Sequence, residues 1–304
     1  MTEITAHFRI VTPLFLGGAD NKTEAELRPA SVKGALRFWW RALQWGKGVT
    51  DVGELKKKED DLFGSSEKGQ SRVTLCLSNS KTEHNIVAEK WSPASWQRYT
   101  GYGLRDNGER PYIKPGQSFA VCFDMRRCDD EQRKQLKKAI IAFGLLGGLG
   151  ARSRKGWGSI TLTSIDGGDY QCPDSQRKWL DAVKNMIGST LPSLAPYSAF
   201  TKATLWNSGP QQDNASKAQG WLGSKYQTLV KGTAPKSDRE QFGLPRGYND
   251  ARRASPLFLH IHQCPSGQAL PTALWLPSDF LSNESTVPGN GDAAKTFVTQ
   301  LCKG

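Results

Sequence analysis

The sequence has no Cys-x-x-Cys pair among its six cysteines, and its start lacks the order of a secretory signal. No apolar run approaches the roughly 20 residues that span a bilayer. These absences argue against a disulfide-stabilised exported protein and against a membrane protein, so we expect a cytoplasmic chain with reduced thiols and no membrane partner. The hydrophobic fraction is also low, at 37%, but ten tryptophans and twelve phenylalanines supply large side chains for a core.

Signatures of nucleotide-binding enzymes are missing as well. Residues 64–71 look like a Walker phosphate loop, but Gln70 stands where the pattern requires lysine. The glycines from Gly148 do not complete G-x-G-x-x-G, because Ser153 occupies the last glycine position. Neither nucleotide hydrolysis nor a dinucleotide cofactor is predicted, and we expect no cofactor.

Histidines are few, four in all, and they leave two catalytic or metal hypotheses open. His260, His262 and Cys264 alternate and would share one face of a strand, as a metal site requires, but no fourth ligand is placed. The alternative is ordinary packing of a strand face, and we predict no metal. His7 is a candidate general base for RNA cleavage or an ordinary strand histidine.

Positive charge is in excess. The net charge is +12 and the pI about 9.4. Residues 1–165 carry 27 Lys and Arg against 18 Asp and Glu, whereas residues 166–304 carry 14 against 11. A polyanion is the expected partner, because phosphate contacts release condensed cations, and nucleic acid is favoured over an anionic membrane surface.

The length of 304 residues suits two domains, which we place at 1–165 and 166–304. In the first part, alternation predicts strands at 6–16, 71–78, 118–124 and 159–165, and helical spacing predicts helices from Ser31, over 52–62 and over 129–146. Ser31 is expected to cap its helix.

This βαββαβ order predicts an α+β fold of ferredoxin-like type with antiparallel sheets. In the second part, helices at 175–187 and 219–230 and strands near 255–263 and 269–280 suggest a second, degraded copy of the same fold.

The most specific local feature is the glycine-rich loop at residues 147–158. Its five glycines permit close backbone approach to a ligand, and Arg152, Arg154 and Lys155 supply charge for phosphates. Trp157 either stacks on a base or packs inward. The loop is therefore predicted to bind a nucleic-acid backbone, with a solvated turn as the alternative.

A second basic feature lies on the helix after Ser31. Lys33, Arg37 and Arg41 form one stripe at helical spacing. The stripe is either a solvated helix face or, since the free N–H groups of the helix start lie near Lys33, a phosphate contact.

These residues resemble a known family. Residues 12–19 and 27–41, followed by Leu62-Phe63-Gly64-Ser65 and the loop at 150–158, are similar to RAMP-superfamily proteins, and in particular to the first subunit of the Cmr complex, the type III-B CRISPR effector. Residues 242–245 and 252–257 resemble a later signature of that family. The likeness is strong to about residue 160 and patchy from 170 to 240.

The resemblance implies two ferredoxin-like domains, no catalysis by this subunit, and partners that are guide RNA, target RNA and other Cmr subunits. It also implies a position near the 3′ part of the guide in an antiviral ribonucleoprotein. Alternatives are a metal-independent endoribonuclease that uses His7 and a purely structural filament cap. The predicted RNA-contact residues are Lys33, Arg37, Arg41, Gly150, Arg152, Arg154, Lys155, Trp157, Arg252 and Arg253.

Overall fold

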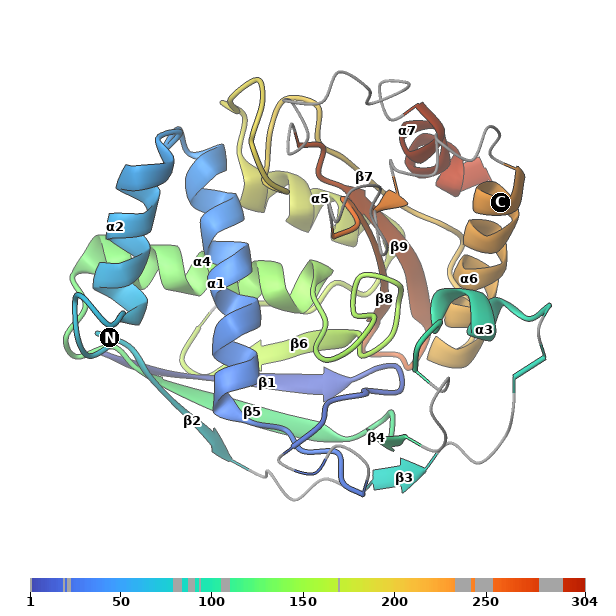
Figure 1. The fold of residues 1–304 in the computed structure, drawn as a ribbon, viewed down its shortest axis with the longest axis horizontal. Helices are drawn as coiled ribbons and strands as arrows, with labels where there is room; N and C mark the ends of the chain where they lie inside the picture. Colours follow the sequence, from blue (N-terminus) through green and yellow to red (C-terminus); the bar gives the residue numbers. More distant parts are fainter. Residues whose placement is uncertain are drawn as a thin grey trace.

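The fold is described from a computed structural model. It covers residues 2–18, 20, 23–78, 84–86, 91–92, 94–104, 110–168, 170–232, 242–243, 254–278 and 292–303. The protein is a mixed α/β structure with antiparallel sheets (Figure 1). In chain order its elements are β1 Glu3–Ile10, α1 Pro29–Gly46, α2 Val52–Phe63, β2 Thr74–Ser78, β3 His84–Ile86, α3 Trp96–Thr100, β4 Pro111–Ile113, β5 Ser118–Asp124, α4 Asp130–Leu146, β6 Ile160–Ile165, α5 Gln176–Ile187, β7 Leu205–Ser208, α6 Ala215–Gly232, β8 Leu257–Gln263, β9 Ala269–Trp275 and α7 Asp292–Gln300, followed by a 3₁₀ turn at Leu301–Lys303.

The first sheet has the strand order β2-β5-β1-β6, and each neighbouring pair is antiparallel. Helices α1 and α4 cover one of its faces, and α2 packs beside α1 (Figure 1). Apolar side chains from β1 and α4 meet between these layers; Phe8, for example, stacks on Phe119 and contacts Phe143. Burial of these faces is the main favourable contribution to folding.

Helices α4 and α1 begin in different ways. Asp129 caps α4 through a capping box with Gln132, as the acidic helix start predicts. Helix α1 begins at Pro29, two residues before Ser31, and no side chain caps it. The prediction that Ser31 caps this helix is therefore wrong, because Pro29 supplies the fixed φ of a first helical position and needs no N–H partner.

The second sheet has the order β7-β9-β8 and packs against α6 and α7. It meets the first sheet where β8 lies beside β6. There the backbone N–H of Ile261 donates to Ser159 Oγ at 3.2 Å, and that of Gln263 donates to Thr161 Oγ1 at 3.0 Å. The largest buried cluster also joins both parts of the chain, since it includes Trp179 of α5. The two sheets are therefore bonded across the predicted division at residue 165.

Within the described residues, no helix is long and apolar enough to cross a membrane. All six cysteines are free thiols.

Candidate nucleic-acid interface

The glycine-rich loop at residues 147–158 connects α4 to β6 and is closed by its own backbone. The N–H of Leu149 donates to Gly158 O at 2.9 Å, and the N–H of Ala151 donates to Phe15 O at 2.8 Å. Gly150 has φ +77°, and a Cβ there would lie 2.4 Å from Phe15 O. This glycine is therefore required by the approach of the segment after β1, whether or not a ligand is present.

Arg152 is the one non-glycine residue in the described chain with a positive φ, at 61°. Its Nε donates to Tyr102 O at 2.7 Å, and its own carbonyl accepts from Lys155 N at 2.8 Å. Such backbone conformations are unfavourable for residues with a Cβ and tend to occur at functional sites. The sharp turn directs the two basic residues that follow toward the second sheet.

Arg154 lies against two aromatic rings that stack on each other. Its guanidinium lies 4.9 Å from the centroid of Phe38 and 4.4 Å from that of Phe258, and its Nη1 donates to Ser255 O at 2.7 Å. Burial lowers the pKa of Arg154 to about 10, so it is charged at neutral pH. These contacts fix a positive charge at the junction of α1 and β8.

Lys155 points toward α6. Its ammonium group donates to Tyr226 Oη at 2.6 Å and to Ser255 Oγ at 3.0 Å, and it lies 4.3 Å from the centroid of the Tyr226 ring. Burial, with further contributions from the positive charges of Arg152 and Arg154, lowers the pKa of Lys155 to about 7. A phosphate at this place would favour the charged form of Lys155.

Trp157 packs inward. It is 3% exposed, and its ring stacks on Trp91 at 5.1 Å and on Trp96 at 5.9 Å between centroids. Its indole N–H donates to Thr100 Oγ1 at 3.1 Å. Stacking of a base on Trp157 would require one of the two neighbouring indoles to move, so its predicted RNA contact stays a prediction.

The basic stripe of α1 faces α2. A single buried carboxylate, that of Glu59, accepts from Arg37 Nε at 2.6 Å and from Arg41 Nη1 at 2.5 Å. Partial burial and the charge of Arg37 lower the pKa of Lys33. One carboxylate shared by two guanidinium groups leaves the stripe positive, as contact with a phosphate requires.

The stripe and the loop meet at a pocket of about 400 Å³. Arg41 lines it from α1 and Arg154 from the loop, and Tyr197 contributes a hydroxyl that is buried and has no hydrogen-bond partner among the described residues. A buried polar atom without a partner is costly and is a place where a ligand atom is favoured. The remaining lining residues are Phe38, Ser198, Ala254 and Ser278.

Two predicted contacts, Arg252 and Arg253, lie outside the described residues. Their neighbour Ala254 is described and lines the pocket of Arg41 and Arg154. The predicted contacts therefore fall into two groups within the described chain. One group consists of Arg41 at the pocket and the predicted contacts of the loop. The other consists of Lys33 and Arg37 of α1.

The histidines lie elsewhere. Burial lowers the pKa of His260 to about 3 and that of His262 to about 4, so both are neutral inside the second sheet. Among the described residues, no group of three or more His, Cys, Asp or Glu is arranged to hold a metal. On the exposed surface of the first sheet, His7 Nε2 lies 2.8 Å from Asp166 Oδ1.

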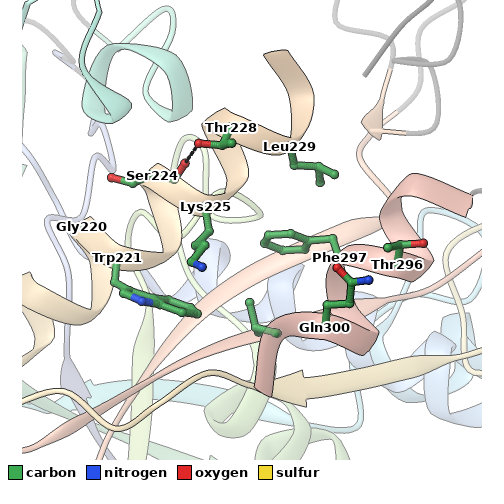
Figure 2. A pocket seen from close by; sticks show the side chains of 10 residues that line it. Gly220, Trp221, Ser224, Lys225, Thr228, Leu229, Thr296, Phe297 and Gln300 are labelled. Carbon is green, nitrogen blue, oxygen red and sulfur yellow. Dashed lines mark hydrogen bonds between the residues drawn. The ribbon is translucent and has the colours of Figure 1, made fainter. Parts of the chain in front are cut away.

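Another cavity lies apart from these residues. It measures about 790 Å³ and runs between α6 and α7, where Trp221 and Lys225 face Phe297 and Gln300 (Figure 2). It contains none of the predicted RNA contacts. Its size alone therefore does not mark it as the nucleic-acid interface.

Comparisons with known proteins assign the chain to a family. The model of the RAMP superfamily matches residues 7–161, about half of the chain and including both the α1 stripe and the loop. The protein belongs to the RAMP superfamily.

Two relatives of this RAMP protein come from Pyrococcus furiosus. It is 27% identical over 266 residues to the CRISPR system Cmr subunit Cmr1-1, covering 78% of this chain and 76% of the relative. It is 29% identical over 187 residues to the subunit Cmr1-2, covering 54% of this chain and 97% of the relative.

Solved structures show a similar fold. The crystal structure of Cmr1 from Pyrococcus furiosus in its apo form matches with a TM-score of 0.65 at 22% identity, covering 99% of this chain and 97% of that one. A chain of the type III-B Cmr-beta complex bound to cognate target RNA and AMPPnP, in the presence of single-stranded DNA, matches with a TM-score of 0.65 at 13% identity, covering 98% of both. At these identities the likeness shows the fold alone.

Several residues of the candidate interface have no signal in the sequence. Glu59 is buried against the α1 stripe, Tyr226 accepts a hydrogen bond from Lys155, and Tyr197 lines the pocket. All of them lie far along the chain from the basic residues that they meet. The packing of α2, of α6 and of the loop between α5 and β7 brings them there, so spacing along the sequence could not have found them.

Proposed function

We propose that this RAMP protein is a non-catalytic, RNA-binding subunit of a type III-B CRISPR ribonucleoprotein, in the role of Cmr1. Its partners would be guide RNA, target RNA and other Cmr subunits, in the cytoplasm. The similarity to Cmr1-1 and Cmr1-2 supports the assignment to this complex. The observation that carries RNA binding is the pocket at which Arg41 and Arg154 converge from separate elements.

We further propose that the chain consists of two ferredoxin-like domains, 1–165 and 166–304. The strand order β2-β5-β1-β6 with α1 and α4 on one face supports this for the first part. In the second part, three antiparallel strands pack with α6 and α7, a less complete version of the same plan. The loop at 147–158 bonds the two parts, so RNA held there would contact both.

The chemistry of the pocket suits phosphate groups. Two guanidinium groups present forked donors, and fixed aromatic rings hold one of them in place. Contacts of this kind are independent of base sequence, as expected where the guide reads sequence by pairing. The phosphates would belong to the guide near its 3′ end, to the target, or to both.

We expect Arg41→Gln and Arg154→Met each to weaken the binding of labelled single-stranded RNA about fivefold to tenfold, equivalent to ~1–1.4 kcal/mol. Gln keeps a polar group facing Glu59, and Met keeps apolar contact with Phe38 and Phe258, so folding should be preserved. Fluorescence anisotropy across a salt series should show a log–log slope shallower by about 0.7 for each lost contact.

The matched control is Arg177→Gln, which removes the same charge from a side chain 94% exposed on α5. If all three variants have the same affinity for single-stranded RNA, the pocket is not the RNA site. Absence of RNA binding by the wild-type protein would favour the structural cap instead. The same samples on a denaturing gel test the nuclease alternative, which predicts cleavage that is lost in His7→Ala.

A further inference from the structure

A second basic cavity lies at the C-terminal end of α2. It measures about 300 Å³ and is lined by Asp61, Lys68, Gln70, Arg72 and Arg127. We refer to it as the α2–α4 cavity, because these residues come from the end of α2, the segment that follows it and the turn before α4. It shares no lining residue with the pocket of Arg41 and Arg154.

The backbone around this cavity is held in place by close contacts and hydrogen bonds. Gly64 has φ +77°, and a Cβ there would lie 2.7 Å from both Gly69 O and Ser71 N, so the segment after α2 folds tightly back on itself. The N–H of Gly69 donates to Ser65 O at 2.8 Å, and that of Arg72 donates to Leu62 O at 3.0 Å. This is the segment whose sequence resembles a phosphate loop without its lysine, and its turn presents Lys68 at the rim.

The guanidinium groups are held in place. Arg72 Nη2 lies 2.9 Å from Asp61 Oδ1, and Arg127 Nη1 donates to Gln70 Oε1 at 2.9 Å. The other oxygen of Asp61 accepts from Gln132 Nε2 at 2.8 Å. Asp61 is thus engaged by Arg72 and Gln132, and among the described residues it forms no salt bridge with Lys68 or Arg127.

The charge balance of the cavity is positive. Three cations face one carboxylate, which leaves +2. Within the described chain, neither Lys68 nor Arg127 has a carboxylate within salt-bridge distance, and the nearby Glu67 lies 3.9 Å from Lys56 Nζ. A polar cavity with two cations that lack a carboxylate partner, one of them a positioned guanidinium, matches the size and donor pattern of a phosphate group.

We propose that the α2–α4 cavity binds a phosphate group of the RNA, as a second contact separate from the pocket of Arg41 and Arg154. The identity of the ligand rests on the proposed function, whereas the anion site itself rests on the cavity. Lys68 and Arg127 would supply the new bonds, and Arg72 would add charge while keeping its link to Asp61.

The test is Lys68→Ala/Arg127→Ala, compared with the matched pair Lys57→Ala/Arg126→Ala. The two residues of the control pair are exposed and lie near the cavity without lining it. Arg126 pairs with Asp124. Anisotropy with labelled single-stranded RNA should show a loss of affinity of about fivefold or more in the cavity variant. Its log–log salt slope should be shallower by about 0.7 per lost contact, with a smaller effect in the control pair.

A second measurement separates the sources of the phosphate. In the Arg41→Gln/Arg154→Met background, inorganic pyrophosphate should raise the melting temperature, and the added cavity substitutions should abolish that rise. Loss of the rise with unchanged RNA affinity would overturn RNA as the ligand and assign a free phosphate compound. If neither RNA binding nor the pyrophosphate response changes, the cavity is not an anion site, even where Arg41→Gln weakens RNA binding as proposed. If the wild-type protein binds no RNA, but the cavity substitutions abolish the rise in melting temperature with pyrophosphate, the proposed function fails while the anion site stands.

Discussion

Trp157→Ala should lower the free energy of unfolding by about 3–5 kcal/mol, the range for removing a large aromatic side chain from a core. The ring is 3% exposed and stacks on both Trp91 and Trp96, so alanine loses both of these contacts. The substitution also leaves Thr100 without the indole N–H that it accepts. Urea unfolding followed by circular dichroism measures the loss.

The control for this variant is Tyr102→Ala. Tyr102 lies in the same region, is 49% exposed, and accepts from Arg152 through its backbone carbonyl, which alanine retains. Its unfolding free energy should stay within about 0.5 kcal/mol of the wild-type value. A Trp157→Ala protein with unchanged stability and reduced RNA affinity would show instead that the ring stacks on a base.

The sequence predicts the elements whose signals are strong and local. The acidic start and periodic apolar face predicted α4, and the alternation of residues 118–124 predicted β5 with the same bounds. The start of α1 differs from the prediction, because Pro29, whose fixed φ suits a first helical position, begins the helix two residues before Ser31. Bonds between the two sheets could not be predicted, since they join Ser159 to Ile261 across a hundred residues.

The candidate site shows the same division between local and distant information. The glycines and basic residues of the loop identified a segment that the structure places at the centre of the molecule. Their directions were not available from the sequence. Arg154 is directed at Phe38 and Phe258, and Lys155 at Tyr226, because of where α1, β8 and α6 pack. The predicted RNA contacts of these residues remain to be tested with variants that preserve packing.

Lys155→Met should remove a pH dependence of stability that the wild-type protein has between about pH 7 and pH 10.5. The folded pKa of Lys155 is about 7, below its ordinary value of 10.5. In this window the unfolded chain therefore holds a proton that the folded chain has released, so the contribution of Lys155 to stability rises with pH. The slope for one full proton is about 1.4 kcal/mol per pH unit, and this is the expected value in the middle of the window, where the two states differ by nearly one proton.

Other groups titrate in the same range with the opposite sign. Burial raises the pKa of Cys122 and that of Cys264, each to about 11, so their contribution to stability falls as pH rises above the pKa of an unfolded thiol. The quantity to measure is therefore the difference in unfolding free energy between the wild-type protein and Lys155→Met at pH 7.5, 8.5 and 9.5, in which these contributions cancel. Exposed Lys138→Met removes one charge from α4 and controls for net charge. A difference that does not change with pH would show that Lys155 is charged throughout.

The same variant decides whether Lys155 binds RNA or only supports the loop. A phosphate beside Lys155 favours its charged form, so RNA binding would take up a proton above pH 7. The affinity of the wild-type protein for single-stranded RNA should then fall between pH 7 and pH 8.5, while that of Lys155→Met stays lower and nearly constant. If the two proteins have the same affinity at each pH, the bonds from Lys155 to Tyr226 and Ser255 are structural. RNA binding by the loop would then rest on Arg152 and Arg154.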